Sequence, residues 1–235
     1  MRGLTASDLL DIADAAGGRD WVSRGLLLAS YAWPGSSEEE RLCLPIGIRD
    51  RLILALRVAT FGRTIAARSR CTVCGAEWEF AVDAGAILES HSADAPSSVM
   101  VDADGAPRQV RLPSSQDLAA TATLDPGDAE WALLERCVEE GAPARSESFR
   151  KAAAEALAAA DPMAHIELEI ECAQCGSATS AVLDIVSLLL SEITSGARRA
   201  AWEVHALAAA YGWTEQEILA MTTARRRRYL AMVSV

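Results

Sequence analysis

Lysine is almost missing from this sequence, and cationic side chains are outnumbered by anionic ones. Of the 22 Lys and Arg residues only Lys151 is a lysine, while 33 Asp and Glu residues bring the net charge to −11. Affinity for nucleic acid comes largely from cationic side chains that neutralise phosphates. The charge therefore argues against a nucleic-acid-binding protein, and equally against binding to an anionic membrane surface.

Long hydrophobic runs are also lacking. No apolar stretch approaches the roughly 20 residues that a membrane-spanning helix needs, and Asp8, Asp11 and Asp14 interrupt the apolar character of the first residues. A signal peptide requires an apolar region there, so we expect none. We therefore expect a cytoplasmic protein without membrane insertion, in a reducing environment that favours metal-bound thiolates over disulfides.

Aromatic residues and histidines are few, and motifs typical of enzymes are not found. Aromatic residues make up 5% of the sequence, so Leu, Ala, Val and Ile must fill the core that a hydrophobic content of 51% allows. No two of His91, His165 and His205 have a metal-ligand spacing. No Gly-rich phosphate loop follows a strand, and no Gly-x-Ser-x-Gly motif is present. The sequence thus predicts neither an enzyme nor a small-molecule substrate.

Cysteine, in contrast, occurs in a pattern that carries chemistry. Residues 71–75 and 172–176 are two copies of the motif Cys-x-x-Cys-Gly. Four thiolates at this spacing form a tetrahedral zinc site of the closed, structural type, which leaves no ligand position for a substrate. The glycine fits because the tight turn needs a residue that tolerates positive φ. The sequence therefore predicts one structural Zn²⁺ bound by Cys71, Cys74, Cys172 and Cys175.

Other interpretations of the six cysteines remain open at this level. The two pairs could be unlinked thiols or two local disulfides, whereas a thioredoxin-like motif needs a βαβ pattern that the sequence lacks. Cys43 and Cys137 lie among apolar neighbours. Because a free cysteine often behaves as a small buried hydrophobe, we expect both of these side chains to be buried.

Hydrophobic periodicity and capping residues predict mainly helices, with strands around the cysteine motifs. The expected helices are at residues 5–16, 21–33, 48–61, 114–122, 126–140, 148–160, 185–211, 214–221 and 225–232. Alternation with period two indicates strands at 78–82, 166–172 and 178–183, and a hairpin turns at the Asp-Gly pair 104–105. Residues 36–40 and 84–98 are expected to be a connector and a loop.

These elements place the chain in the α+β class, as a mainly α-helical domain with a small antiparallel zinc-ribbon β element formed by the two Cys-x-x-Cys-Gly knuckles. One zinc ion would join distant segments into one domain, because metal binding supplies roughly 10 kcal/mol of folding free energy in small zinc modules. The expected divisions are an N-terminal helical part (1–70), the first knuckle with a hairpin (71–113), a helical insert (114–162), the second knuckle (163–183) and the C-terminal helices (184–235).

One helical stretch is more specific than an amphipathic helix requires. Residues 48–62 contain the pairs Arg49-Asp50, Leu56-Arg57 and Phe61-Gly62. This pattern resembles the phage T4-type baseplate protein family, also called the baseplate hub assembly chaperone family, which has relatives in phage-tail-like contractile injection systems. Further similar stretches follow in the same order: 110–118, 133–137, the second cysteine pair, 203–205, 211–213 and 218–219.

The resemblance implies a non-enzymatic role at a baseplate, either as a structural component of the particle or as a cytoplasmic assembly chaperone for the hub and spike proteins. Such a protein needs binding surfaces, and exposed Trp, Tyr and Arg are typical interface anchors. A position in the core is the alternative for the aromatic residues. The candidates for partner binding are Arg49, Arg57, Arg63, Trp202, Trp213 and Tyr229.

A second interpretation is a zinc-ribbon regulatory or nucleic-acid-associated factor, since zinc ribbons occur in nucleic-acid machinery. The run from Arg225 to Arg228 would support it. A basic run near a helix end also lies in water or contacts an acidic partner, and a nucleic-acid surface needs more basic residues with interleaved aromatics. A zinc enzyme fits less well, because four cysteine ligands leave no open coordination position.

Overall fold

The computed structural model describes residues 1–91, 96–103, 105–139 and 145–233. It is mainly helical, and its strands form separate two-stranded antiparallel sheets, so the prediction of a mainly helical α+β fold is confirmed. None of the described helices combines the length and the apolar character needed to cross a membrane. The elements in chain order are α1 (Ala6–Ala16), α2 (Trp21–Ala32), α3 (Glu38–Cys43), α4 (Ile46–Phe61), β1 (Thr64–Arg70), β2 (Glu77–Asp83), α5 (Ala84–Ser90), β3 (Ser98–Ala103), β4 (Ala106–Arg111), α6 (Ser115–Thr121), α7 (Pro126–Cys137), α8 (Glu147–Ala160), the 3₁₀ turn η1 (Pro162–Ala164), β5 (Glu167–Glu171), β6 (Ala178–Val182), α9 (Ile185–Tyr211), α10 (Glu215–Ala220) and α11 (Thr223–Val233).

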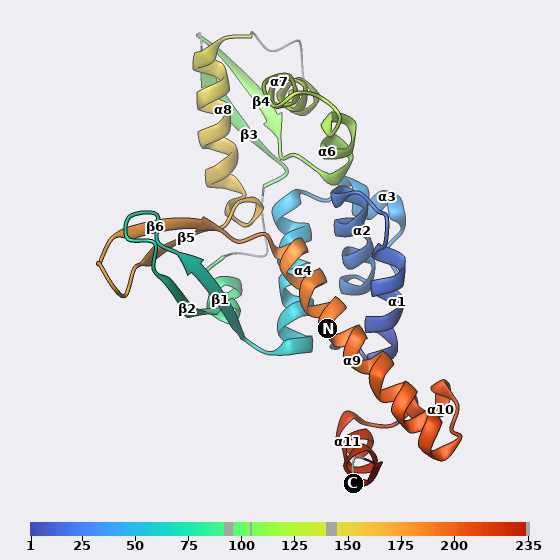
Figure 1. Cartoon of the computed structure of the whole chain (residues 1–235). Coiled ribbons are helices and arrows are strands. Elements are labelled where there is room, and N and C mark those ends of the chain that lie inside the picture. Colours follow the sequence, from blue (N-terminus) through green and yellow to red (C-terminus); the bar gives the residue numbers. More distant parts are fainter. Residues whose placement is uncertain (92–95, 104, 140–144, 234–235) are drawn as a thin grey trace.

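Helices α1, α2, α4 and α9 form the body of the molecule (Figure 1). Leu28 of α2, Ile53 of α4 and Leu189 of α9 are fully buried in their common core. A Cβ on Gly196 of α9 would lie 2.8 Å from Leu9 Cδ1 of α1, so the absence of a side chain at Gly196 permits this close helix contact. The apolar faces of these helices therefore bring the first and last thirds of the chain together.

Local capping signals set the bounds of the C-terminal helices, as the sequence predicts. Asp184 accepts a hydrogen bond from a backbone N–H in the first turn of α9, and Thr214 with Glu217 forms a capping box at α10. Gly212 ends α9 with a φ of 68°. Glycine adopts this left-handed conformation at little cost, which makes it a frequent residue at helix C-termini.

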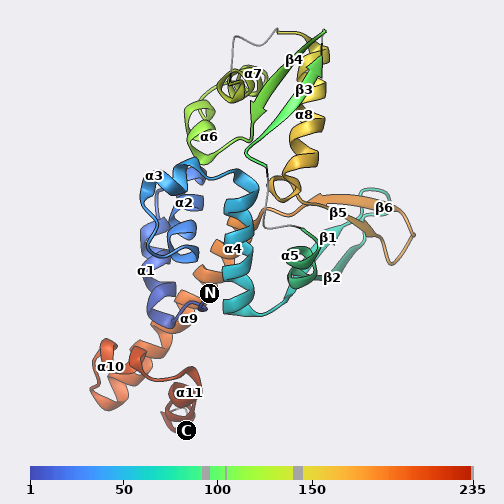
Figure 2. The same cartoon turned by 180° about the vertical axis from the view of Figure 1, so that it is seen from behind.

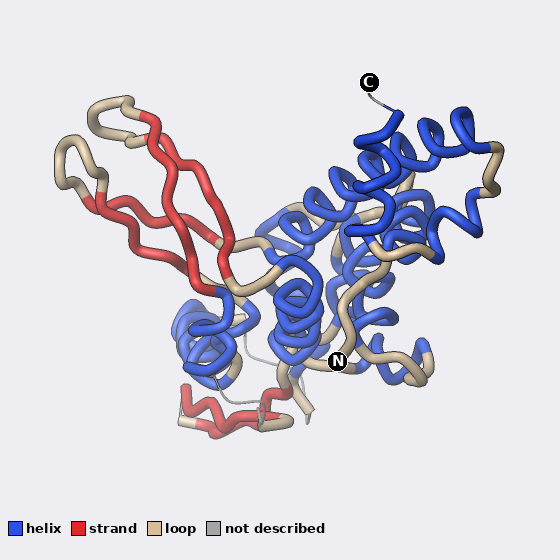
Figure 3. The backbone as a smooth tube through the Cα atoms, turned by 90° about the horizontal axis from the view of Figure 1, so that it is seen from below, coloured by secondary structure: helices blue, strands red, loops and turns tan. Residues whose placement is uncertain are grey.

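The hairpins β1–β2 and β5–β6 project from the body side by side (Figure 3). At their roots, Ile65 of β1 and Ile166, just before β5, are buried in the main core. The turns that carry the cysteines lie at the far ends of the hairpins (Figure 3). The body therefore holds the two roots, and any further contact between the hairpins has to come from their own side chains.

The hairpin β3–β4 packs with α7 and α8 around a separate small core, made of Val101, Val110, Leu134 and Phe149 among others. Figures 1 and 2 show this unit and the C-terminal helices α10 and α11 at opposite ends of the molecule. The hairpin predicted at the Asp-Gly pair is confirmed, although Asp104 itself lies outside the described residues.

This unit is joined to the body at the first turn of α4. Gly47 N donates a hydrogen bond of 2.8 Å to Asp161 Oδ2, and Ile46 N donates one of 3.0 Å to Pro113 O. A Cβ on Gly47 would lie 1.7 Å from Asp161 Oδ1, so only glycine permits this contact. Helix α4 therefore contacts helix α9 as well as the segments that follow β4 and α8 of this unit.

Asp117 of α6 is fully buried and joins three elements. Arg111 of β4 donates hydrogen bonds of 2.6 and 2.7 Å to its two oxygens, and Arg136 of α7 donates one of 3.0 Å. Burial alone would raise the pKa of Asp117. Hydrogen bonds from Arg111 and from Ser114 outweigh the effect of burial and lower the pKa to about 2.

Two connecting segments differ from the sequence prediction. Helix α3 begins within the connector expected at residues 36–40, because Ser37 and Glu40 form a capping box there. Helix α5 occupies the start of the loop expected at 84–98, because Asp83 accepts hydrogen bonds from the backbone of its first turn. Both helices are short, so neither has the apolar stripe by which the longer helices are recognised.

The cysteines outside the motifs have different environments. Cys137 is buried in the core of the β3–β4 unit, as predicted. The prediction that Cys43 is buried is wrong, because this residue ends the short surface helix α3 and its side chain is exposed. Gly141, which the sequence places at the end of the helix starting at residue 126, lies outside the described residues.

Asp117→Asn is expected to lower the free energy of unfolding by about 3 kcal/mol at neutral pH, because it leaves two arginines beside a neutral, buried amide. The carboxylate has a lowered pKa in the folded state, from 3.8 to about 2. The ionised carboxylate therefore stabilises the fold fully at pH values above its pKa in the unfolded chain. This stabilisation is lost as the pH falls through its pKa in the folded state. Urea unfolding should show the variant and wild type converging between about pH 4 and pH 2.

Asp102→Asn is the matched control, since Asp102 lies exposed on β3. It should unfold like the wild type throughout this range. A stability difference for Asp117→Asn that stays constant down to pH 2 would contradict the assigned role of the carboxylate.

Candidate metal centre

The two cysteine turns have the same backbone construction. In the first, Gly75 N donates to Cys71 O at 3.0 Å, and Cys71 N donates to Ala76 O at 2.8 Å. In the second, Gly176 N donates to Cys172 O at 2.9 Å. The φ angles of Gly75 and Gly176 are 72° and 69°, so the positive φ predicted after each cysteine pair is confirmed.

These turns bring four sulfur atoms together. The Sγ atoms of Cys71, Cys74, Cys172 and Cys175 all lie within 4.8 Å of one another. Cys71 Sγ is 3.6 Å from Cys175 Sγ, and Cys74 Sγ is 3.7 Å from Cys172 Sγ. A disulfide bond is about 2.05 Å long. Close sulfur contacts therefore run between the two turns without a disulfide bond, and all four residues are free cysteines.

The distances suit a single metal ion at the centre of the cluster. Four thiolates about 2.3 Å from a tetrahedral ion lie about 3.8 Å from one another. Thiolate ligands are soft and select ions such as Zn²⁺ or Cu⁺, or iron–sulfur clusters, over Mg²⁺ and Ca²⁺. Within the described part of the chain, this is the one group of His, Cys, Asp and Glu side chains close enough to hold a metal ion.

A serine hydroxyl favours the thiolate form of two ligands. Ser177 Oγ lies 3.1 Å from Cys71 Sγ and 3.1 Å from Cys175 Sγ. This hydroxyl, together with backbone N–H groups of the first turn, lowers the pKa of Cys71 to about 6. It is also the main cause that lowers the pKa of Cys175. The sequence prediction does not include Ser177, and its one signal is its position directly after the second motif.

Cys74 behaves in the opposite way. The backbone N–H of Ala76 favours its thiolate, but partial desolvation of the sulfur and the three neighbouring cysteine sulfurs together raise the pKa of Cys74 to about 12. Like charges at these distances repel one another, so full deprotonation of the cluster requires a cation. Metal binding at this site would therefore release protons.

The four cysteines differ in their exposure. Cys71 and Cys172 are each 2% exposed, whereas Cys74 and Cys175 are exposed. A tetrahedral ion with four protein ligands has no free coordination position. A metal ion held by all four cysteines would hold the tips of the two hairpins together.

Two of the predicted partner-binding arginines are almost fully buried. Arg49 is 4% exposed and Arg57 is 2% exposed. Arg57 donates hydrogen bonds of 2.6 and 2.9 Å to Glu192 of α9, and Arg49 donates one of 2.7 Å to Asp50. This part of the prediction is wrong, because helical spacing does not show which charged positions face another element of the fold.

The other predicted partner-binding residues are at least partly accessible. Arg63 is half exposed and forms ion pairs with carboxylates of β2 and α5. Trp202 is 57% exposed on α9. Trp213 and Tyr229 are half-buried against each other, with ring centroids 4.9 Å apart. Binding of a partner by these residues stays a prediction, and Trp202 is the most accessible aromatic side chain among them.

We expect metal analysis of protein purified without chelator to find one zinc ion per chain. Modification of the cysteine thiols with a mercurial reagent should release this ion. A zinc stoichiometry near zero in protein purified without chelator, before any mercurial treatment, would contradict the metal centre, whatever the oxidation state of the thiols.

Cys172→Ser is expected to lower the melting temperature of the whole chain, because removal of one ligand removes much of the free energy of metal binding. Cys43→Ser is the matched control, since Cys43 is a free cysteine outside the cluster. It should melt like the wild type. Equal melting temperatures for Cys172→Ser and wild type would show that the cluster does not stabilise the fold.

No protein-family model matches this chain, and no curated protein and no solved structure matches it significantly. The proposed function therefore depends on the metal centre, the internal ion pairs and the exposed surface.

Proposed function

We propose that this chain is a non-enzymatic baseplate component, or an assembly chaperone for the hub and spike proteins, of a phage tail or contractile injection system. A structural Zn²⁺ in a zinc-ribbon-like pair of hairpins holds it together. The observation that carries the structural, non-enzymatic part of the proposal is the cluster of four cysteines at the hairpin tips, and the resemblance of residues 48–62 carries the baseplate assignment. Such a cluster serves structure instead of catalysis, because protein ligands take all its coordination positions.

The residues that carry the baseplate resemblance make internal contacts. Arg57 pairs with Glu192 at 2.6 Å, and Glu203 pairs with Arg226 at 2.7 Å with both side chains almost fully buried. Asp117, in the similar stretch at 110–118, joins two arginines. Each of these contacts joins different helices or strands, and the pair Arg57–Glu192 spans 135 residues. The resemblance therefore supports a common scaffold, and other residues must supply the surface that binds partners.

Partner binding in this proposal uses the C-terminal arm, which we define as the second half of α9 with α10 and α11. Figure 1 shows that the arm extends away from the body. Tyr211 and Trp213 stack with ring centroids 4.5 Å apart, and the ring of Tyr229 meets both edge-on. Trp202 is exposed on the same arm. Aromatic side chains such as these, clustered or exposed on one arm, are typical of interface anchors.

A second candidate is a zinc-ribbon regulatory or nucleic-acid-associated factor, which the exposed side chains of Arg225, Arg227 and Arg228 favour. On the cysteine-bearing hairpin, however, Arg68 and Arg70 form ion pairs with glutamates of β2. These pairs reduce the attraction of the hairpin for phosphates. The net charge of −11 opposes nucleic-acid binding as well.

Co-expression with the hub and spike proteins of the same system, followed by affinity purification, tests the baseplate proposal. We expect a complex whose dissociation constant rises about tenfold in Trp202→Ala, because truncation of an interface tryptophan typically costs more than about 1 kcal/mol. Met100→Ala is the matched control, since it shortens a similarly exposed apolar side chain on β3.

Retention on heparin or DNA at moderate salt, without binding to hub or spike, would contradict the baseplate proposal and favour the second candidate. Mass spectrometry of purified particles distinguishes the two forms of the proposal. Presence of the chain indicates a structural component, and absence indicates a transient chaperone.

A further inference from the structure

Two adjoining hollows form a groove along one face of α9, apart from the metal centre. The first, of about 410 Å³, lies between α2, η1 and the N-terminal turns of α4 and α9. The second, of about 470 Å³, lies between the end of α1 and the middle of α9. Arg24 and Leu190 line both hollows. We call this surface, from Trp21 through Arg24 and Leu190 to Arg198, the α9 groove.

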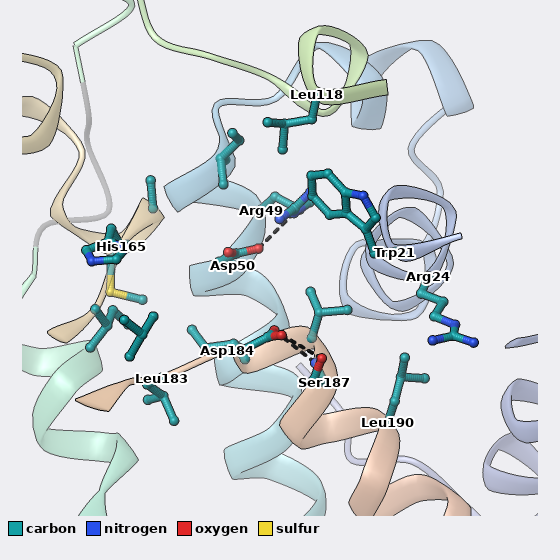
Figure 4. Close-up of a pocket in the computed structure, with 17 residues that line it drawn as sticks. Trp21, Arg24, Arg49, Asp50, Leu118, His165, Leu183, Asp184, Ser187 and Leu190 are labelled. Carbon is teal, nitrogen blue, oxygen red and sulfur yellow. Dashed lines mark hydrogen bonds and ion pairs between the residues drawn. The ribbon is translucent and has the colours of Figure 1, made fainter. Parts of the chain in front are cut away.

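The first hollow is mainly apolar and lies beside an exposed tryptophan. Figure 4 shows Trp21 and Arg24 of α2 across from Ser187 and Leu190 of α9. Trp21 is 51% exposed, although its side chain is large and apolar. An apolar hollow next to an accessible tryptophan suits one large apolar side chain of a binding partner.

The second hollow has a floor of small side chains. Its small lining residues are Ala13, Ala16, Gly17, Ser191, Thr194 and Ser195. Small side chains let a second helix approach closely, because the distance between helix axes depends on the side chains at the contact. At 1.5 Å per residue, the exposed face of α9 from Ser187 to Arg198 is about 16 Å long, or about three helical turns.

Arginines without an ion pair are spread along the groove, and Asp184 at the first hollow is a carboxylate whose hydrogen bonds within the described chain come from Ser187. Arg24 and Arg198 are exposed, and neither side chain forms an ion pair or a hydrogen bond with any residue that the structure describes. Arg49, in contrast, is neutralised by Asp50. Asp50 and Asp184 also line the first hollow, which disfavours any anionic group inside it and suits an apolar side chain there. Separate cations along a groove instead match carboxylates spaced along a peptide.

We propose that the α9 groove binds an acidic amphipathic helix of a partner protein. One large apolar side chain of that helix enters the hollow beside Trp21, and its backbone packs on the small residues of the second hollow. Its Asp or Glu side chains pair with Arg24 and Arg198. Helices occupy such grooves through apolar residues at positions i, i+3, i+4 and i+7. The proposal defines the partner helix only by its charge and its apolar side chains. It therefore goes beyond the baseplate assignment and does not depend on it.

Selection from a displayed library of random peptides of about 16 residues, about 24 Å long as helices, tests the proposal on the full chain. We expect the selected peptides to carry Leu, Phe or Trp at helical spacing, with Asp or Glu beside them. Fluorescence anisotropy should show about tenfold weaker binding to Trp21→Ala and to the double variant Arg24→Glu with Arg198→Glu. Arg225→Glu, on exposed α11, is the matched control and should bind like the wild type.

Circular dichroism melting of each variant separates loss of binding from loss of folding. We expect unchanged melting, because the substituted side chains are exposed. The proposal is overturned if no peptide is enriched, if the enriched peptides are basic, or if the groove substitutions leave binding unchanged. Sedimentation equilibrium could instead show a dimer that these substitutions abolish. The occupant would then be a second copy of the chain, and the proposal would also be overturned. Peptide binding without hub or spike binding would contradict only the proposed function.

Discussion

The contact between the two cysteine turns is the constraint that joins the two hairpins projecting from the main core. Cys74 and Cys172 are 98 residues apart, yet their sulfurs lie 3.7 Å apart. Strand β1 directly follows α4, and β6 directly precedes α9, so both hairpins start from the same pair of packed helices. A metal ion at the tips would therefore close a long loop that begins and ends in the main core. Closing such a loop removes conformational entropy from the unfolded chain, which is the physical basis for a stabilising role.

Arginine supplies a second set of connections. Arg57 joins α4 to α9 through Glu192, and Arg226 joins α11 to α9 through Glu203. A planar guanidinium suits this use, because it stays charged and donates several hydrogen bonds in a fixed geometry. The consequence for function is that three arginines, Arg49, Arg57 and Arg226, are buried inside the fold. The exposed cations that remain, such as Arg24 and Arg198, then have more influence on which partner the surface attracts.

The features that the sequence predicts correctly are local ones. The turn of a Cys-x-x-Cys-Gly motif and the capping box at Thr214 depend on a few neighbouring residues, and both occur as expected. The burial of Arg57 is different, because its partner Glu192 is 135 residues away and is positioned only by helix packing. The α9 groove escapes prediction for the same reason, since three helices have to pack before its hollows exist. The meeting of the two cysteine pairs is the exception, because the chemistry of four thiolates predicts a long-range contact.

Hydrogen–deuterium exchange, with and without removal of the metal by a chelator, tests the central claim most directly. If the metal joins the hairpin tips, its removal should speed exchange of the amides of β1–β2 and β5–β6 together. Exchange should change least in the β3–β4 unit, which has its own core. Equal protection of both hairpins before and after metal removal would contradict the account, because the hairpins would then be held by their roots and side chains alone.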